Sequence, residues 1–213
     1  MRMVLNADDL GMSDAVNAAI FSGIDAGWVT SVSVLARGPV FADAARRLVG
    51  APVSVGVHLD ATEFFRRGSE PAAIRAEWSA QLQRVLDTGL PVSHLDSHQH
   101  LHYRAPFREL LLDLARENGI ARVRRMGVPP GWWRVRAQAR AWLHNRHLPV
   151  TTDAFYSLSS FIAADCPRHE TIEIMLHPGN PHHADYPREV DRLQSGWLAT
   201  LAAPLVLIRW SDV

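Results

Sequence analysis

The sequence predicts an α/β fold, in which parallel strands are covered by helices. Short apolar runs alternate with helical stretches along most of the chain. The length of 213 residues, with 47% hydrophobic and 21% charged residues, fits one compact domain over residues 1–213. Polar residues able to do chemistry follow several of the apolar runs. A barrel and an open, doubly wound sheet both satisfy this pattern, and both place their sites at the carboxyl ends of the strands.

The first half of the chain has clear strand and helix signals. Residues 2–6 read as a buried strand, and Ser13 or Asp14 can then cap a helix that ends at Gly27. The elements that follow are a strand over Val32–Ala36, a helix over Phe41–Leu48, a strand over Val53–Val57, a helix over Ala72–Leu86 and a strand over Val92–Leu95.

The second half continues the alternation with one weak stretch. Apolar residues at helical spacing predict a helix over Phe107–Asn118, which Gly119 ends. No clear signal follows Pro149 until the strand at Thr171. The other predicted elements are a strand over Ala121–Arg125, a helix from about Trp132 to Arg146, a strand over Thr171–Leu176, a helix over Glu189–Leu201 and a strand over Leu205–Trp210.

Composition excludes several classes of function. The 22 acidic and 22 basic residues cancel, so the net charge gives no reason to expect nucleic acid or a membrane surface as partner. All the basic residues are arginine, which removes every mechanism that needs a lysine. Cys166 is the only cysteine, so no intramolecular disulfide or thiolate metal cage forms. No signal peptide or membrane-spanning run is visible, and we expect a cytoplasmic protein.

The densest chemical feature is the stretch from His94 to His102, with four histidines and one aspartate in nine residues. An extended chain would put the polar members on one face, and a helix would align three of the histidines, so spacing alone leaves both open. Pro91 and Val92 lead in with strand character, and the helix at Phe107 follows. The cluster therefore lies after a strand and before a helix.

Three more strand ends carry candidate ligands or bases. Asp8 and Asp9 follow the first strand, His58 follows the third, and His177 follows the strand that ends at Leu176. One carboxylate and two imidazoles suit a zinc, manganese, cobalt or nickel hydrolase, and a second carboxylate can act as general base. Adjacent aspartates just past a strand point to different sides, so the doublet can supply both roles. Alone, the doublet could equally be a turn or a helix cap.

An arginine- and tryptophan-rich stretch covers residues 132–142. It could be a face for polyanions or lipids. We favour an amphipathic helix with tryptophans in the core and arginines in solvent. His182 and His183 are expected to be on the surface of a loop.

Motifs spread over residues 4 to about 178 resemble the YdjC-like carbohydrate deacetylases, which include chitooligosaccharide deacetylases and proteins associated with hopanoid biosynthesis. The matching stretches are 6–17, 29–31, 55–58, 94–102 and 175–178, and the end of the chain at 208–213 is also similar. The resemblance implies a single-domain distorted (β/α) barrel related to polysaccharide deacetylases. It also implies one divalent metal ion (zinc, magnesium, manganese, cobalt or nickel) and hydrolysis of an N-acetyl group from a small N-acetylated sugar, oligosaccharide or glycolipid.

The resemblance also implies residue roles. Metal ligands would be Asp9, His58 and His98. The general base would be Asp8, which Arg124 could orient, and His177 would be the acid or a substrate contact. The remaining candidates for substrate contact are His100, His102, Phe64 and Tyr156.

Residues 59–70 depart from the family pattern in the region expected to form part of the substrate rim. This departure leaves the identity of the substrate open. Two other functions also remain open: a metal-dependent phosphoesterase on a similar barrel, because histidine clusters at strand ends serve that chemistry too, and a non-catalytic sugar-binding relative that retains the pocket. A homodimer is possible.

Overall fold

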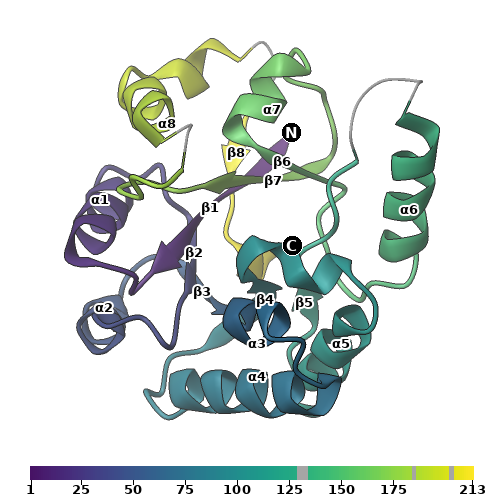
Figure 1. The fold of residues 1–213 in the computed structure, drawn as a ribbon. Coiled ribbons are helices and arrows are strands. Elements are labelled where there is room, and N and C mark those ends of the chain that lie inside the picture. The colour runs from purple at the N-terminus through teal and green to yellow at the C-terminus, as the bar shows by residue number, and fades with distance from the viewer. Residues whose placement is uncertain (129–133, 184–185, 202–203) are drawn as a thin grey trace.

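The computed structural model describes residues 1–128, 134–183, 186–201 and 204–213 (Figure 1). Its strands are β1 (Arg2–Leu10), β2 (Ser31–Val34), β3 (Ser54–Leu59), β4 (Val92–Ser97), β5 (Arg122–Val123), β6 (Ala154–Ser157), β7 (Thr171–Leu176) and β8 (Val206–Leu207). They form one sheet in the order β5-β4-β3-β2-β1-β7-β6, with β8 beside β1. The strand pairings among the described residues are all parallel, as the alternation of strands and helices predicts.

Helices cover the outside of this sheet (Figure 1). They are α1 (Asp14–Asp25), α2 (Phe41–Leu48), α3 (Thr62–Arg66), α4 (Pro71–Leu86), α5 (Phe107–Glu117), α6 (Val135–Asn145), α7 (Leu158–Ala163) and α8 (Tyr186–Gln194). The described residues also form short 3₁₀ segments, namely η1 (His98–Tyr103), η3 (Trp197–Thr200) and η4 (Trp210–Asp212). No helix in the described part of the chain is both long and apolar enough to cross a membrane.

The sheet curves into a distorted barrel. The two edges of the strand order, β5 and β6, lie close because the chain just before β6 pairs with β5. The Val123 amide donates to the Val150 carbonyl at 3.1 Å, and the Val150 amide donates to the Ala121 carbonyl at 3.0 Å. Of the two folds that the sequence allowed, the barrel is therefore confirmed and the open sheet is excluded.

The C-terminal segment closes the amino-terminal end of the barrel. Strand β8 pairs with Arg2 and Met3 at the start of β1, whereas β2 pairs with β1 only from Asn6 onward. Trp210 is fully buried, its amide donates to Ser31 Oγ at 3.0 Å, and its ring stacks on that of His94 with the ring centres 5.0 Å apart. The carboxyl ends of the strands are left to form a site.

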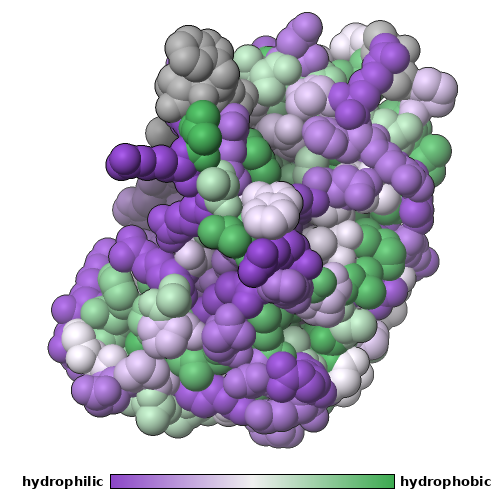
Figure 2. All heavy atoms as spheres, turned by 90° about the vertical axis from the view of Figure 1, so that its right-hand side faces the viewer, coloured by the Kyte–Doolittle hydropathy of each residue, from purple (hydrophilic) through white to green (hydrophobic). Residues whose placement is uncertain are grey.

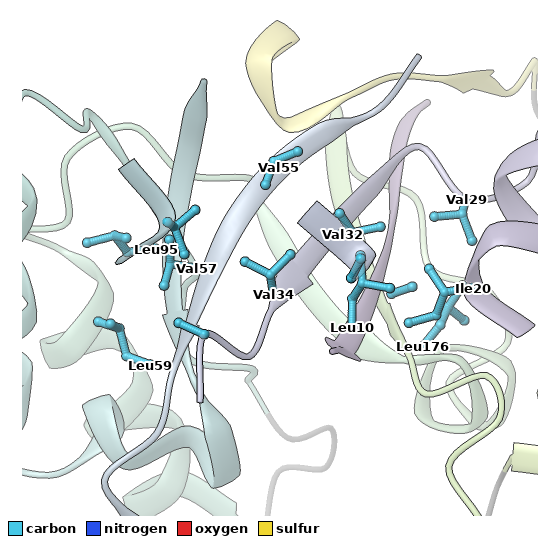
Figure 3. Packing of buried hydrophobic residues seen from close by; sticks show 14 of the residues in the cluster. Leu10, Ile20, Val29, Val32, Val34, Val55, Val57, Leu59, Leu95 and Leu176 are labelled. Carbon is cyan, nitrogen blue, oxygen red and sulfur yellow. The ribbon is translucent and has the colours of Figure 1, made fainter. Parts of the chain in front are cut away.

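The core explains why the strands read as continuous apolar runs. Both faces of a parallel sheet are buried, so successive residues pack alternately into the barrel and against the helices. Figure 3 shows this packing for the valines of β2 and β3 and for Leu10, Ile20 and Leu176 around them. β-Branched residues suit such strands because their side chains pack well on a pleated surface.

Several elements differ from the predictions. Strands β1 and β3 are longer than expected and contain Asp8, Asp9 and His58 rather than ending before them. Helix α3, β6 and α7 were not predicted, and the last predicted helix divides into α8 and η3, with Gly196 between them at φ 75°. Of the last predicted strand, residues 206–207 form β8, and the Ile208 amide also donates to the Met3 carbonyl of β1 at 2.9 Å.

The prediction of core tryptophans in the region of α6 is wrong for Trp142, whose residue surface is 61% exposed. The predicted start of this helix, including Trp132 and Trp133, lies outside the described residues.

Candidate active site

A cavity of about 410 Å³ opens at the carboxyl ends of the strands. It is lined by Asp8, Asp9, Met12, His58, His98, Gln99, His100, Met175, His177, Asn180, His182 and His183. The four strand ends that the sequence singled out therefore meet in one place.

Both aspartates of the doublet line this cavity. In a regular strand, adjacent side chains point to opposite faces. The pairing of β1 with β2 shifts register between Ala7 and Leu10, and Asp9 has a left-handed backbone with φ 68°. Such an irregularity redirects a side chain and is frequent next to active sites. The two carboxylates were expected to point to different sides of the strand. The bulge instead brings both to one cavity.

Asp9, His58 and His98 form a group whose ligand atoms all lie within 4.8 Å of one another. Asp9 Oδ1 is 3.6 Å from His58 Nε2 and 3.1 Å from His98 Nδ1. The Oδ1 atom is buried and makes no hydrogen bond of acceptable geometry. One carboxylate oxygen and two imidazole nitrogens are a common protein donor set for a divalent cation, and a cation would satisfy the buried oxygen. The residues present fit the implied metal.

The second nitrogen of His58 is held by a carboxylate. His58 Nδ1 lies 2.8 Å from Asp96 Oδ1, so Nε2 faces the cavity. Carboxylates commonly orient metal-binding imidazoles in this way. Burial alone would lower the pKa of His58, but the carboxylates of Asp96 and Asp8 outweigh it and raise the pKa to about 9.

Arg124 holds Asp8 through two parallel hydrogen bonds. Its Nη1 and Nη2 donate to the two carboxylate oxygens of Asp8, each at 2.7 Å. Asn6 Nδ2 donates to the same carboxylate at 2.7 Å. Burial raises the pKa of Asp8, but the charge of Arg124, followed by that of His58, more than offsets it, so the pKa lies below its usual value. Asp8 is therefore an oriented, ionised carboxylate.

Arg124 is itself fully buried among three carboxylates. Besides Asp8, it contacts Asp96 Oδ2 through Nη1 at 2.6 Å and Glu173 Oε1 through Nε at 2.8 Å. Its guanidinium carbon also lies 5.1 Å from the centre of the Phe155 ring. Burial raises the pKa of Glu173 to about 7, against the opposing charge of Arg124. One guanidinium thus links Asp8, the carboxylate behind His58 and a strand across the barrel.

The loop after β7 supplies the opposite wall. Asn180 Nδ2 donates to Asp9 Oδ2 at 2.8 Å, which fixes the carboxylate whose other oxygen faces the two histidines. His177 stacks on His183 with ring centres 3.8 Å apart, and its amide donates to Glu189 Oε2 at 2.9 Å. Burial lowers the pKa of His177 to about 4. His183 lines the cavity, although it was expected to lie on the surface of a loop.

Segment η1 begins at His98 with an unusual backbone. Gln99 and His100 both have φ 52°, in the left-handed region that non-glycine residues seldom adopt. The tight turn that results places His98, Gln99 and His100 all along the cavity. Strain of this kind is typical of functional sites.

The four predicted substrate contacts lie in different surroundings. Among them, His100 is the one that lines the cavity. His102 is buried and has its Nδ1 2.6 Å from Ser97 Oγ. Phe64 packs from α3 against the core, and Tyr156 has its hydroxyl 3.3 Å from His169 Nε2, away from the cavity lining.

Sequence reasoning assigned no role to Asp96, Glu173 or Asn180. Asp96 had a signal, because it lies two residues before His98 in the histidine cluster. Glu173 also had one, because a charged residue inside the apolar strand Thr171–Leu176 needs a buried partner. Asn180 gave none beyond its place in a Pro-Gly-Asn turn.

Comparison with curated proteins shows relatives along most of the chain. A "Carbohydrate deacetylase" of Brevibacillus brevis is 30% identical over 207 residues, with 84% of this chain and 81% of the relative covered. One of Oceanobacillus iheyensis is 26% identical, with coverages of 84% and 86%. A "Chitooligosaccharide deacetylase" of Klebsiella pneumoniae is 27% identical, with coverages of 83% and 81%.

Solved structures share the fold. A proposed cellobiose-phosphate cleavage protein of Enterococcus faecalis superposes with a TM-score of 0.79 at 20% identity, covering 99% of this chain and 98% of that one. A family 4 carbohydrate esterase of Streptomyces lividans, in complex with acetate, gives 0.57 at 14% identity, with coverages of 97% and 91%. The family model described as YdjC-like protein matches residues 2–203. The chain therefore belongs to the YdjC-like protein family.

Proposed function

We propose that this chain is a metal-dependent carbohydrate deacetylase that hydrolyses the N-acetyl group of an amino sugar, a short oligosaccharide or a glycolipid. The observation that carries the proposal is the meeting of Asp9, His58 and His98 in one cavity beside the oriented carboxylate of Asp8. The names of the relatives support the same activity.

Asp9, His58 and His98 would hold the cation, which could be zinc, magnesium, manganese, cobalt or nickel. Such an ion, when bound, polarises an acyl carbonyl and makes water a stronger nucleophile at neutral pH. Asp96 keeps His58 Nε2 turned toward the cavity, and Asn180 keeps Asp9 in place. A cobalt ion is described in a family 4 acetyl xylan esterase that shares the fold at 16% identity.

Asp8 is proposed as the general base. It is ionised, it lines the cavity, and its Oδ2 lies 3.9 Å from His58 Nε2, next to the proposed metal ligands. A base must be within hydrogen-bond reach of the proton that it removes, and the bidentate contact with Arg124 fixes the direction of the carboxylate. Asp8 would take the proton of the attacking water.

His177 is proposed to contact the substrate from the opposite wall and to protonate the leaving amine. Its pKa of about 4 means that it is neutral in the free protein at pH 7, when it can donate one hydrogen bond. It would act as the acid after receiving a proton during turnover, and Asp8 is the group able to supply one.

The charge of the cavity favours an amide over a phosphoester. No arginine lines it among the described residues, and Arg124 is engaged by three carboxylates. A phosphate dianion would meet Asp8 and Asp9 without a guanidinium to bind it, whereas an acetamide is neutral.

The test is acetate release from a panel of N-acetylated sugars, run with each of the five metals. Asp8→Asn should lower the release by roughly 10² or more, whereas the exposed Asp43→Asn should not, and thermal unfolding checks that both variants fold. Phosphate release from sugar phosphates in place of acetate release would support the phosphoesterase. Sugar binding without turnover would support a non-catalytic relative, and failure to bind any metal would refute the ligand assignment.

A further inference from the structure

Helix α6 turns an apolar stripe toward solvent. The exposed fractions of Val135, Trp142 and Leu143 are 63%, 61% and 52%. With Ala139, which is also exposed, they follow the spacing i, i+4, i+7, i+8, which places them on one face of a helix. The buried residues of α6 are the small Ala141 and the polar His144. A helix of a globular domain normally directs its apolar stripe inward.

The same exposed surface is basic. Between residues 134 and 146 the chain contains no aspartate or glutamate, although acidic and basic residues balance over the whole sequence. The guanidinium of Arg146 lies 5.2 Å from the ring centre of Trp142, so charge and aromatic surface adjoin. The exposed arginines of this segment are Arg134, Arg136, Arg140 and Arg146. The zero net charge of the chain therefore hides a local cationic surface.

Figure 2 looks onto the side of the molecule where α6 lies at the right of Figure 1. Green and pale side chains protrude there among strongly purple ones, without a separate hydrophobic region. This mixture of apolar, aromatic and cationic side chains is the pattern of a helix that lies in a membrane interface, where arginines meet lipid phosphates and apolar groups enter the acyl boundary.

We propose that α6 docks this protein onto an anionic membrane surface. Val135, Trp142 and Leu143 would enter the boundary between headgroups and acyl chains, and the flanking arginines would bind lipid phosphates. The helix has 11 residues, far fewer than the roughly 20 needed to span a bilayer, so it would lie in the plane of the surface.

A second copy of the chain fits the exposed face of α6 less well than an anionic membrane does. A symmetric contact through this face would bring its arginines against their own copies, because a two-fold interface uses the same patch on both partners. Like charges at an interface oppose association, whereas anionic lipid neutralises them. An acidic protein could match the charge, but the outward apolar stripe would remain to be covered.

Helix α6 also adjoins η1, the segment that carries three cavity residues, His98, Gln99 and His100. Arg140 Nη2 donates to the Tyr103 carbonyl at 2.8 Å, and the ring of His144 lies 5.5 Å from that of Tyr103. Tyr103 ends η1, which begins at His98. Docking through α6 would therefore bring the η1 side of the cavity close to the membrane.

The test is co-sedimentation of the full chain with vesicles of phosphatidylcholine alone or mixed with phosphatidylglycerol. We expect binding to the mixed vesicles that weakens with salt. Arg136→Gln with Arg146→Gln should weaken it roughly 30-fold, because each arginine near an anionic surface contributes about a factor of five. Trp142→Ala with Leu143→Ala should weaken it about 10-fold or more. The matched control, Arg46→Gln with Arg66→Gln, removes the same charge from exposed sites on other helices.

Three results would overturn the proposal. The first is equal binding to both kinds of vesicle, or no binding. The second is an equal loss of vesicle binding in the control variant, which would mean that no particular face of the protein binds the membrane. The third is a lipid-free dimer, seen by sedimentation equilibrium, that Trp142→Ala dissociates, since this would assign the face to a second copy. Thermal unfolding of each variant distinguishes loss of the surface from loss of the fold.

Discussion

Replacing Arg124 tests the central electrostatic arrangement of the site. Arg124→Met keeps an unbranched apolar stem in the barrel and removes the guanidinium. The carboxylates of Asp8, Asp96 and Glu173 then lose their shared partner in a region without solvent access. Removing one member of a buried ion pair typically costs about 3–5 kcal/mol, because the remaining charge is uncompensated. We expect the free energy of unfolding of the metal-free protein to fall by about that amount.

Arg124→Lys is the matched control for charge. Lysine retains the positive charge but cannot reproduce the planar fork that binds both oxygens of Asp8. We expect a smaller loss of stability, about 1–3 kcal/mol, from the weakened charged hydrogen bonds. Under the proposed function, Lys should lower kcat about 10²-fold through misplacement of the base. In any Met variant that folds, the acidic limb of the pH–rate profile should move to higher pH, because Arg124 holds the pKa of Asp8 low.

Urea unfolding with a chelator present measures the free energy of unfolding. Acetate release between pH 4 and 9 measures kcat and the position of the acidic limb of the pH–rate profile. A Met variant whose unfolding free energy stays within about 1 kcal/mol of the natural protein would refute the reasoning about uncompensated buried charge. A Lys variant with natural kcat would show that the bidentate geometry does not matter to Asp8.

Three further predictions concern the proposed metal ligands and the core. His58 has a pKa of about 9, so a cation must displace its proton. Metal affinity, measured by calorimetry, should therefore rise about tenfold per pH unit up to roughly pH 9. An affinity that does not change with pH would contradict the assignment of His58 as a ligand. Asn180→Ala frees Asp9 and should lower metal affinity about 10–100-fold in the same assay, where an unchanged Kd would exclude a positioning role. In Gly56→Ala, the new Cβ would lie 2.3 Å from His94 Nε2, so unfolding should become easier by about 1–3 kcal/mol in urea; natural stability would mean that the buried imidazole moves freely.

The convergence at the carboxyl ends could be predicted because it depends on local sequence and one topological rule. Parallel strands point the same way, so residues that end or follow them meet at one edge, as Asp9, His58 and His98 do. Elements with strong periodicity, such as α2 and β7, have the bounds that the sequence predicts. The metal-ligand roles themselves are still predictions.

Other features depend on contacts that the local sequence does not reveal. Strand β6 has only four residues and is stabilised by pairing with β7, and α3 has five residues, none of them buried. The bulge that turns Asp9 into the cavity arises from the register between β1 and β2. Trp142 reads as a core residue by type, but the face of α6 that packs inward is set by the neighbouring η1 and not by hydrophobicity.

The charges of the described site account for the valence of the cation that it would bind. Asp8, Asp9 and Asp96 have lowered pKa values and are ionised at neutral pH, whereas Glu173, with a pKa of about 7, is only partly so. Arg124 balances one of the three ionised carboxylates, and the raised pKa of His58 favours a proton on this imidazole as a second positive charge. A monovalent ion that displaced this proton would leave the same excess of negative charge. A divalent cation that displaced it would bring the three aspartates and Arg124 together to neutrality, so we expect this site to prefer a divalent ion.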